Sequence, residues 1–199
     1  MSHISSLVGV LAFQGDFAEH MQVLHSLNAE AIEVRNLEDL AKVDRLIIPG
    51  GESTVMAKFL ESTGMRQQII ARVEAEPNAK SQKPLAVYGT CAGAILLAKE
   101  VTGKNSPQPL GLMDITVDRN AYGTQLQSFE ADIVVKNINT PIHCSFIRSP
   151  KITRVGPDVE ILASHEGVPV LVRQGRLLAA TFHPEVRGNT VIHEMFLAL

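Results

Sequence analysis

The stretch Pro84-Leu-Ala-Val-Tyr-Gly-Thr-Cys91-Ala-Gly93-Ala-Ile-Leu-Leu-Ala-Lys99 decides the fold, because it predicts a buried strand, then a cysteine, then a helix. Residues 85–88 are apolar enough for a central parallel strand, which is covered on both faces. Residues 92–98 are small and then aliphatic, with good helix formers and no breaker after Gly93. A buried strand that leads directly into a helix is typical of an α/β protein with a parallel sheet.

Cys91 lies at this junction, between Gly89 and Gly93 and next to Thr90 and Ala92. A side chain that projects from a tight strand-to-helix turn needs small neighbours, because a large one would clash with the returning backbone. The free N–H groups and the positive dipole end of the following helix favour the reactive thiolate form of a cysteine. A lone intracellular cysteine is more often a small buried hydrophobe. The Gly-x-Cys-x-Gly spacing at a strand–helix junction nevertheless favours a nucleophile.

Such a nucleophile needs a base, and the base needs a group that orients it. The apolar residues 177–182 predict a strand that runs into His183-Pro184-Glu185. Proline pushes the residue before it towards extended geometry, in which residues i and i+2 project to the same side. His183 and Glu185 can therefore lie side by side, with the carboxylate holding the imidazole towards Cys91. A strand-end histidine followed by a solvated acid gives the same pattern, so this hypothesis depends on the cysteine turn.

The composition predicts one globular domain over residues 1–199. Hydrophobic residues make up 45% of the chain and charged residues 20%, and both values are ordinary for a folded protein in water. The net charge is −3 and there is no basic run, which argues against nucleic acid or an anionic membrane as a partner. No apolar run reaches transmembrane length, and the first six residues lack the features of a signal peptide, so a cytoplasmic location is expected.

Cysteine and histidine usage predicts reduced thiols and no metal site. Without a secretory signal, Cys91 and Cys144 are expected to stay free rather than to pair. No cluster of cysteines and histidines has the spacing of zinc ligands. We therefore expect neither a metal nor a cofactor.

The order of strands and helices predicts a doubly wound, mostly parallel central sheet with antiparallel additions in the C-terminal half. Strands are expected at residues 7–13, 31–34, 44–48 and 85–88, with helices at residues 17–28, after Asn36 as N-cap, at residues 54–62 and at residues 92–98. Further strands are expected at residues 112–117, 129–135, 142–146, 159–162, 168–172 and 177–182, with a hairpin turn at residues 174–175 and a closing helix from residue 190. Residues 74–83 and 102–109 are expected to form loops.

The loop Pro49-Gly-Gly51-Glu-Ser53-Thr follows the third strand and is expected at the same edge of the sheet as Cys91. Ligands bind at this edge in doubly wound sheets. A backbone N–H near Gly51 and that of Ala92 could together form an oxyanion hole, and Ser53 could cap the helix that follows. A glycine pair after proline is also typical of a plain turn.

Together these motifs resemble the class I, or triad, glutamine amidotransferases, which implies a flavodoxin-like architecture. The finer resemblance is to one branch, the glutaminase subunits of pyridoxal 5′-phosphate synthase. Four stretches carry it: Gln14-Gly15, Pro49-Gly-Gly-Glu-Ser-Thr54, Arg119-Asn-Ala-Tyr-Gly-Thr-Gln125 with Ser128-Phe-Glu130, and Phe146-Ile-Arg148. The triad motifs identify only the superfamily, whereas the segments beginning at Arg119 and Phe146 are more specific to the branch.

The resemblance implies a role for each matched residue. Cys91 is implied as the nucleophile, His183 as the acid and base, and Glu185 as the orienting carboxylate. Residues implied to border bound L-glutamine are Gly51, Glu52, Ser53, Arg119, Ile147 and Arg148. The two arginines suit a substrate carboxylate, which a guanidinium grips bidentately, although a surface salt bridge is the commoner role of an arginine.

The resemblance also implies an activity and a partner. The implied reaction is hydrolysis of L-glutamine through a thioester, with ammonia passed to the barrel-shaped synthase subunit in vitamin B6 biosynthesis; the implied enzyme classes are hydrolase and lyase. Gln14 is implied to lie near the contact with the synthase. Its neighbour Phe13, and Ser149 after the arginine, depart from the leucine and alanine that are usual in the branch.

Three other interpretations remain open from the sequence. The chain could be a glutaminase that serves a different synthase, in imidazole or purine formation, since the catalytic residues are shared. It could be a cysteine hydrolase or stress protein on a related fold, which would not need the late His-Pro-Glu. It could also be a regulatory subunit with a vestigial site, although the triad residues are all present.

Overall fold

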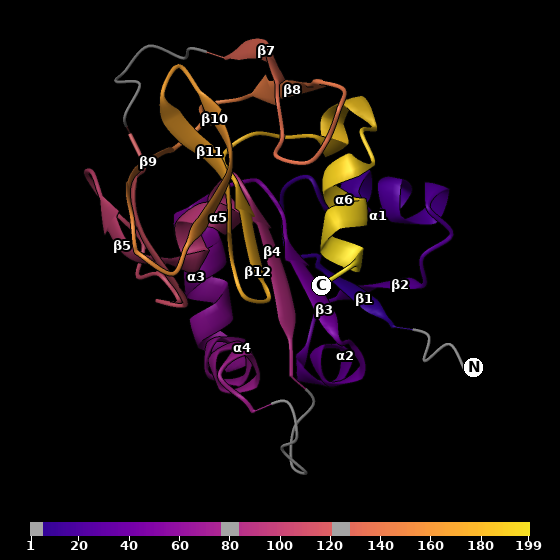
Figure 1. Cartoon of the computed structure of the whole chain (residues 1–199). Coiled ribbons are helices and arrows are strands. Elements are labelled where there is room, and N and C mark those ends of the chain that lie inside the picture. Colours follow the sequence, from indigo (N-terminus) through magenta and orange to yellow (C-terminus); the bar gives the residue numbers. More distant parts are fainter. Residues whose placement is uncertain (1–5, 77–83, 121–127) are drawn as a thin grey trace.

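A computed structural model of the chain describes residues 6–76, 84–120 and 128–199. Its largest sheet has seven strands in the order β10-β11-β12-β4-β3-β1-β2 (Figure 1). The strands are β1 (Val8–Leu11), β2 (Ala31–Val34), β3 (Arg45–Ile48), β4 (Ala86–Thr90), β5 (Ala98–Thr102), β6 (Met113–Asp118), β7 (Phe129–Ile133), β8 (Ile142–Phe146), β9 (Lys151–Val155), β10 (Glu160–His165), β11 (Val168–Gln174) and β12 (Leu177–Ala180). The helices are α1 (Phe17–Ser26), α2 (Leu37–Lys42), α3 (Ser53–Ser62), α4 (Met65–Val73), α5 (Ala92–Leu97), the 3-10 helix η1 (Glu185–Arg187) and α6 (Val191–Leu197).

The parallel part of this sheet confirms the expected fold class. Strands β2, β1, β3, β4 and β12 are neighbours in that order and all run parallel. This order reverses between β1 and β3, as in flavodoxin-like doubly wound sheets, where ligands bind beyond the carboxyl ends of the strands. Strands β11 and β10 extend the sheet in antiparallel fashion, and the turn between β11 and β12 contains Gly175 at φ 55°, as expected for a hairpin.

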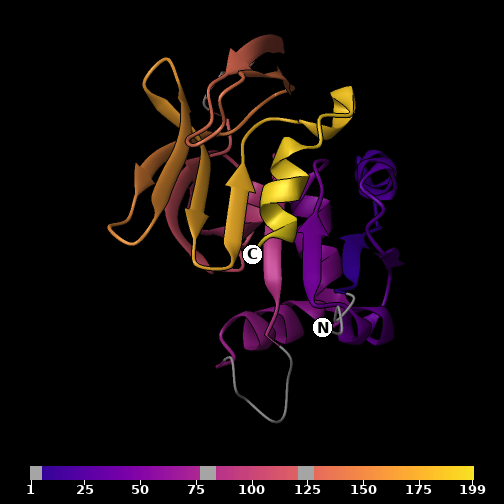
Figure 2. The same ribbon diagram turned by 45° about the vertical axis from the view of Figure 1, so that its right-hand side comes forward.

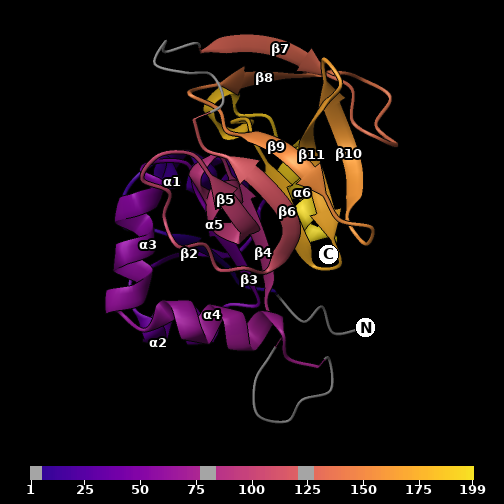
Figure 3. The same ribbon diagram turned by 90° about the vertical axis from the view of Figure 1, so that its left-hand side faces the viewer.

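Helices cover both faces of the sheet because neighbouring strand residues point to opposite sides. In β3, Leu46 and Ile48 pack into one core with residues of α2, α3, α4 and α5, whereas Ile47 packs into the other with α1 and α6. Figure 2 brings α6 in front of the sheet, and Figure 3 shows α3, α4 and α5 together beside β3 and β4. Both faces of the central strands are therefore buried, which explains their uninterrupted apolar sequence.

Two smaller sheets flank the central one. Strands β5, β6 and β9 form the first, and β7 and β8 form an antiparallel pair beyond the carboxyl ends of β4 and β12 (Figure 1). The expected helix over residues 92–98 ends one residue early, and the chain continues as β5 because Ala98 pairs with Met113. Neither β5, β9 nor α4 was predicted, since each is short and has only part of its side chains buried.

The N-terminal boundary of α3 corrects one expectation. The N-cap of this helix is Glu52, whose carboxylate accepts hydrogen bonds from the N–H groups of Thr54 and Val55 at 3.2 and 3.3 Å. Ser53 is instead the first helical residue and is buried. A longer carboxylate side chain reaches back over the first turn and carries the charge that favours the positive end of the helix dipole, so it takes the place expected for the serine. The expected cap of α2 is confirmed, because Asn36 accepts from the N–H of Asp39 at 2.9 Å.

Across residues 6–76, 84–120 and 128–199, no helix combines the length and the apolar character that crossing a bilayer demands. Residues 77–83 of the expected loop at residues 74–83 lie outside the described part of the chain. The same is true of residues 121–127, which include most of the motif Arg119–Gln125.

Candidate active site

The segments that follow β1, β3, β4 and β12 meet at the carboxyl edge of the sheet and surround a pocket of about 320 Å³. Its lining consists of Asp16, Gly51, Glu52, Ser53, Cys91, Ile95, Arg119, Asn120, Ile147, Arg148 and His183. Eight of the residues singled out from the sequence are therefore brought to one place. Of the other three, Glu185 lies behind His183, Ala92 follows Cys91 at the start of α5, and Gln14 contacts the backbone of the Gly51 loop.

Cys91 occupies a strained turn between β4 and α5. Its backbone has φ 47° and ψ −100°, a conformation that L-residues rarely adopt, and strain of this kind concentrates at functional sites. The flanking glycines are required by close packing: a β-carbon on Gly93 would lie 2.0 Å from the carbonyl oxygen of Ile48, and one on Gly89 would lie 2.5 Å from the backbone of Gly93. Cys91 as a whole is only 8% exposed, and its Sγ lies 3.9 Å from the carbonyl oxygen of Ile147.

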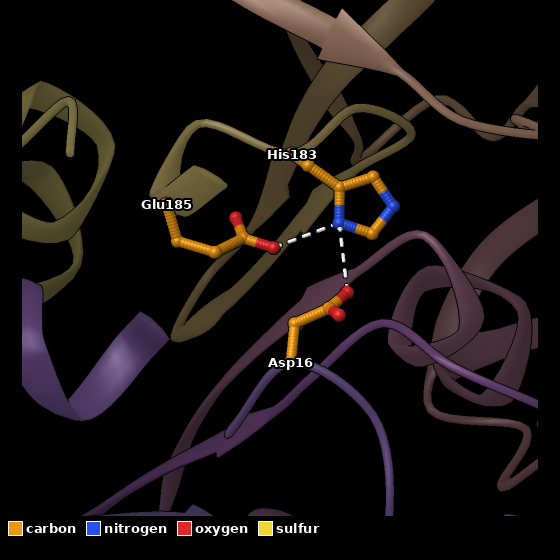
Figure 4. A group of neighbouring side chains, drawn as sticks. All are labelled: Asp16, His183 and Glu185. Carbon is orange, nitrogen blue, oxygen red and sulfur yellow. Dashed lines mark hydrogen bonds and ion pairs between the residues drawn. The ribbon is translucent and has the colours of Figure 1, made fainter. Parts of the chain in front are cut away.

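His183 and Glu185 lie next to each other, although not for the predicted reason. The Nδ1 of His183 is 2.7 Å from Oε1 of Glu185 (Figure 4). Pro184 has φ −71° and ψ −30°, so the chain turns into η1 instead of staying extended. The tight turn brings the carboxylate back beneath the ring, and the side chain of Glu185 is fully buried.

Asp16 is a second carboxylate at the same ring nitrogen and was not predicted. Its Oδ2 lies 3.3 Å from Nδ1 of His183, and it approaches from the loop after β1 (Figure 4). The only sequence signal was its place directly after Gln14-Gly15 at the end of a strand. Donor atoms of Asp16, His183 and Glu185 lie within 4.8 Å of one another, close enough to hold a metal ion. The Nδ1 proton that bonds both carboxylates would have to leave first, so the arrangement fits a charged imidazole better than a metal site.

The surroundings of His183 favour its protonated form. Burial by itself lowers the pKa of His183, but hydrogen bonds to Asp16, Cys91 and Glu185 outweigh it and raise the pKa from 6.5 to about 12. The same contact with His183 lowers the pKa of Asp16. For Glu185 burial dominates, so its pKa is raised even though His183 favours the ionised form. The site can therefore hold an imidazolium next to the cysteine sulfur.

The two arginines of the pocket differ in what they already bind. Arg119 donates to Oε1 of Glu52 at 2.5 Å, to the hydroxyl of Thr54 at 2.8 Å and to the carbonyl of Asn105 at 2.7 Å. Within the described ranges, no hydrogen bond or ion pair engages the guanidinium of Arg148, which is exposed at the pocket with a backbone φ of 47°. Arg148 is therefore the cation available to a ligand, and Arg119 orients Glu52.

The loop that carries Gly51 is joined to the first strand by Gln14. The side-chain amide of Gln14 accepts from the N–H of Glu52 and donates to its carbonyl, both at 3.1 Å. Gly51 has φ 140°, a conformation that favours glycine, and a β-carbon there would lie 2.7 Å from Oε1 of Gln14. The N–H of Ala92, in the first turn of α5, has no acceptor within its helix.

Cys144 is the alternative thiol and lies outside the pocket. It is fully buried in β8, and burial, together with Glu185 and Asp132, raises its pKa to about 12. Both cysteines are free. A thiol in such an environment is a poor nucleophile.

A buried histidine pair lies behind Glu185 and predicts a pH-dependent stability. Burial, and then the nearby His193 and His183, lower the pKa of His20 well below 6.5, and burial lowers the pKa of His193 to about 4. In the unfolded chain each histidine binds a proton near pH 6.5, so the unfolded state binds more protons as the pH falls from 6.5 towards 4. We therefore expect the free energy of unfolding to fall over this range, by up to about 1.4 kcal/mol per pH unit for each histidine. His183 adds nothing below pH 6.5, because it is protonated in both states.

Urea unfolding at pH 7, 6 and 5 measures this slope. His193→Phe should flatten it, whereas replacing the exposed His25 on α1 by alanine should leave it unchanged. The same slope in His193→Phe as in the unchanged protein would contradict the assignment of a neutral buried His193.

Comparison with known proteins gives independent evidence of the family. A family model described as the SNO glutamine amidotransferase family matches residues 10–198. The chain is 47% identical over 196 residues to the pyridoxal 5′-phosphate synthase subunit PdxT of Mycolicibacterium vanbaalenii, covering 96% of each chain. It is 46% identical over 193 residues to the PdxT subunit of Thermus thermophilus, covering 97% of each.

Solved structures agree with these relatives. One described as a glutamine amidotransferase has 46% sequence identity and a TM-score of 0.87, covering 96% of this chain and 97% of its own. A putative GMP synthase subunit from Thermoplasma acidophilum has 15% identity and a TM-score of 0.65, covering 98% of this chain and 94% of its own, which shows the shared fold alone.

These findings correct one expectation and establish the family. The expected assignment to the lyases is wrong, because the matched family and the similar structure are both those of glutamine amidotransferases. Amide cleavage by a glutaminase is a net hydrolysis that consumes water, and it is not an elimination. With a family model that spans residues 10–198 and relatives that match over nearly their whole length, the chain belongs to the SNO glutamine amidotransferase family.

Proposed function

We propose that this protein hydrolyses L-glutamine to glutamate and ammonia and passes the ammonia to a synthase subunit that makes pyridoxal 5′-phosphate. The observation that carries the proposal is Cys91, held in a strained turn at a pocket that His183 also lines, with His183 bonded to Glu185. The relatives named as PdxT subunits support the choice of synthase over those of imidazole or purine formation. Two free thiols fit a reducing cytoplasm as the place of the reaction.

The proposed reaction begins with the thiol proton of Cys91 already transferred to His183, whose surroundings favour the protonated ring. The sulfur attacks the carboxamide carbon, a carbon–sulfur bond forms, and the carbonyl π electrons move to oxygen. The N–H groups near Gly51 and Ala92 would stabilise this oxyanion. His183 then protonates the nitrogen, the carbon–nitrogen bond breaks, and ammonia leaves a thioester. Water that gives a proton to His183 hydrolyses the thioester, which releases glutamate and restores the thiol.

Glu185 and Asp16 have separate parts in this scheme. The buried Glu185, at 2.7 Å, orients the ring and stabilises its charged form, as the carboxylate of a triad does. Asp16 is partly exposed and more distant at 3.3 Å, so it adds charge stabilisation from the solvent side. The catalytic carboxylate is therefore Glu185.

The α-carboxylate of glutamine is assigned to Arg148, which leads to a prediction for its KM. Arg148→Ala removes the pocket guanidinium that has no hydrogen-bond or ion-pair partner among the described residues, while the alanine keeps the strain of the turn. Loss of a charge-assisted contact of about 1.5–3 kcal/mol corresponds to a KM higher by roughly 10- to 100-fold, with kcat little changed. Steady-state kinetics with glutamine measures it.

Arg154→Ala is the matched control, because this exposed arginine pairs with Asp114 on β6, away from the pocket. It should leave KM unchanged. An unaltered KM for Arg148→Ala would move the carboxylate site elsewhere, with Arg119 the next candidate.

The proposal as a whole is tested by measuring ammonia release from glutamine with and without a purified synthase subunit of pyridoxal 5′-phosphate synthase. We expect hydrolysis that depends on that subunit, and formation of the product chromophore once the sugar phosphates are added. Hydrolysis with a purine or imidazole synthase instead would favour the other glutaminase interpretation. No hydrolysis with any of them would favour a regulatory subunit.

A further inference from the structure

A chain of buried polar side chains continues from Glu185 into the protein, away from the pocket. His20 of α1 places its Nε2 3.6 Å from Oε1 of Glu185 and 3.0 Å from the hydroxyl of Thr90. Its Nδ1 lies 2.9 Å from Nε2 of His193 in α6. His20, Thr90 and His193 are all 0% exposed. A buried histidine pair is costly unless its members are hydrogen-bonded, so its position directly behind the triad carboxylate needs an explanation.

The contacts of Glu185 show what such a histidine could do. Of its two carboxylate oxygens, Oε1 faces both His183 at 2.7 Å and His20 at 3.6 Å, and Oε2 has no hydrogen-bond partner among the described residues. Among the described residues, two titratable side chains lie against this carboxylate, His183 on the pocket side and His20 on the buried side. The longer distance is typical of a resting active site, whose hydrogen bonds shorten when substrate binds.

The unpaired atoms of the network decide which nitrogen of His20 carries its proton. If Nδ1 of His20 were protonated and donated to His193, the Nδ1 proton of His193 would be a buried donor, and that atom has no partner in the described chain. The Nε2 lone pair of His20 would then face the carboxylate. If His193 donates from Nε2 to Nδ1 of His20, only an unpaired acceptor remains on His193. The Nε2–H of His20 then donates to the hydroxyl of Thr90 at 3.0 Å, with Oε1 of Glu185 3.6 Å away. Orphaned buried N–H groups are rare, so the second tautomer is favoured.

We propose that His20 is a positioning residue of the active site: its Nε2–H, which bonds the hydroxyl of Thr90 and faces Oε1 of Glu185, supports this carboxylate from the buried side, and His193 fixes the tautomer that provides this proton. This inference rests on the proposed glutaminase function. His20 acts only through Glu185 and does not touch the reacting atoms. Burial, which lowers the pKa of His20, keeps the ring neutral as this arrangement requires.

In the described part of the chain, the titratable groups that face His20 come from elements packed around it. They are His193 from α6, Glu185 from η1, His183 from the loop before it and Tyr88 from β4, whose ring lies 6.1 Å from that of His20. Losing the N–H of His20 should favour the protonated form of Glu185, which in turn weakens the imidazolium of His183. The acid limb of the pH profile of kcat/KM should therefore move to higher pH and the basic limb to lower pH.

The test compares His20→Asn with His20→Gln in the complex with the synthase subunit. A glutamine amide can place an N–H where Nε2 of histidine lies, whereas an asparagine amide reaches only the position of Nδ1. We expect His20→Asn to lower kcat by about 10- to 100-fold, as for other residues that orient a catalytic ligand, with KM within about twofold and a narrower pH profile. His20→Gln should regain most of kcat and the original profile.

Tyr88→Phe is the matched control within the same buried cluster, since its hydroxyl has no hydrogen-bond partner in the described chain. It should leave kcat and the pH profile unchanged. Losses of kcat that are equal in His20→Asn and His20→Gln and follow their thermal stability would overturn the proposal, as would a normal kcat and profile in His20→Asn.

The role of His193 supplies a second test that does not require His20→Asn to fold. His193→Phe should lower kcat by a smaller factor than His20→Asn, because the tautomer of His20 is then no longer fixed. In a His20→Gln background this effect should vanish, since an amide has no tautomer to fix. Independent, additive effects of the two substitutions would count against the proposal.

Alkylation of Cys91 by iodoacetamide separates this inference from the proposed function. It reports the cysteine–histidine–carboxylate coupling without glutamine turnover, and Cys144, with its pKa raised to about 12 by burial, does not compete. His20→Asn should raise the pH of half-maximal alkylation by about one unit, a tenfold change in the ionisation equilibrium. An unmoved midpoint overturns the role of His20, whereas absence of glutamine hydrolysis with a moved midpoint overturns only the proposed function.

Discussion

Replacing Cys91 by alanine is expected to lower glutamine hydrolysis by about 10³-fold or more, because a nucleophile that acts as a unit with its base cannot be lost in part. The substitution removes one sulfur atom from a side chain that is almost buried. The β-carbon stays, so the strain at φ 47° is the same and the fold should be retained. Ammonia release at saturating glutamine in the presence of the synthase subunit is the measurement, with circular dichroism to verify folding.

Cys144→Ala is the matched control for this variant. Cys144 is the other free thiol, and it is fully buried in the core between β8 and its neighbours. Its replacement should cost stability through a small cavity and leave kcat and KM unchanged. Substantial hydrolysis by Cys91→Ala, together with loss of activity in Cys144→Ala, would reverse the assignment of the nucleophile.

The second large effect is expected when the synthase subunit docks, which should raise the turnover of glutamine. We expect the chain without its synthase subunit to hydrolyse glutamine slowly, and docking to raise turnover by about 10²–10³-fold, the value of one oxyanion-hole donor. The physical basis is the peptide at residues 50–51, which glycine allows to turn towards or away from the developing negative charge. Free ammonia is a wasted product, so coupling hydrolysis to docking is advantageous.

Gln14 is positioned to transmit such a contact. Its amide holds both the N–H and the carbonyl of Glu52, next to Gly51, and it is only half-buried at the end of β1. In Gln14→Ala the loop loses both hydrogen bonds, so most of the activation by the synthase should disappear. Turnover is to be compared for the chain alone, with partner, and with partner plus the substitution.

Gln67→Ala is the control, since the side chain of Glu61 is the one partner that the amide of Gln67 on α4 has among the described residues. It should not affect activation. Full activity of the isolated chain would refute partner control. Activation that persists in Gln14→Ala would still be consistent with control by the partner, but it would place the contact with the synthase subunit in another loop.

The local pattern of the chain was sufficient for the fold class. The apolar runs at residues 46–48 and 85–88 and the helix signals between them correspond to β3, β4 and the helices around them, because a strand buried on both faces leaves little room for polar residues. Turn chemistry was equally readable, since Gly175 and Asn28 take positive φ where the pattern ended an element. Short, half-exposed elements such as β5 and β9 were missed, because their pairing partners and not their own sequence stabilise them.

By itself, then, the sequence determined the parallel sheet, the strained turn at Cys91 and the pairing of His183 with Glu185, since each depends on residues close together in the chain. The tertiary structure alone decided which distant groups complete the site. It placed Asp16 at His183, Glu52 instead of Ser53 at the start of α3, Arg119 on Glu52, and the histidines of α1 and α6 behind Glu185. The physical reason is that hydrogen bonds and burial between residues far apart depend on how the elements pack, and no local periodicity encodes that packing.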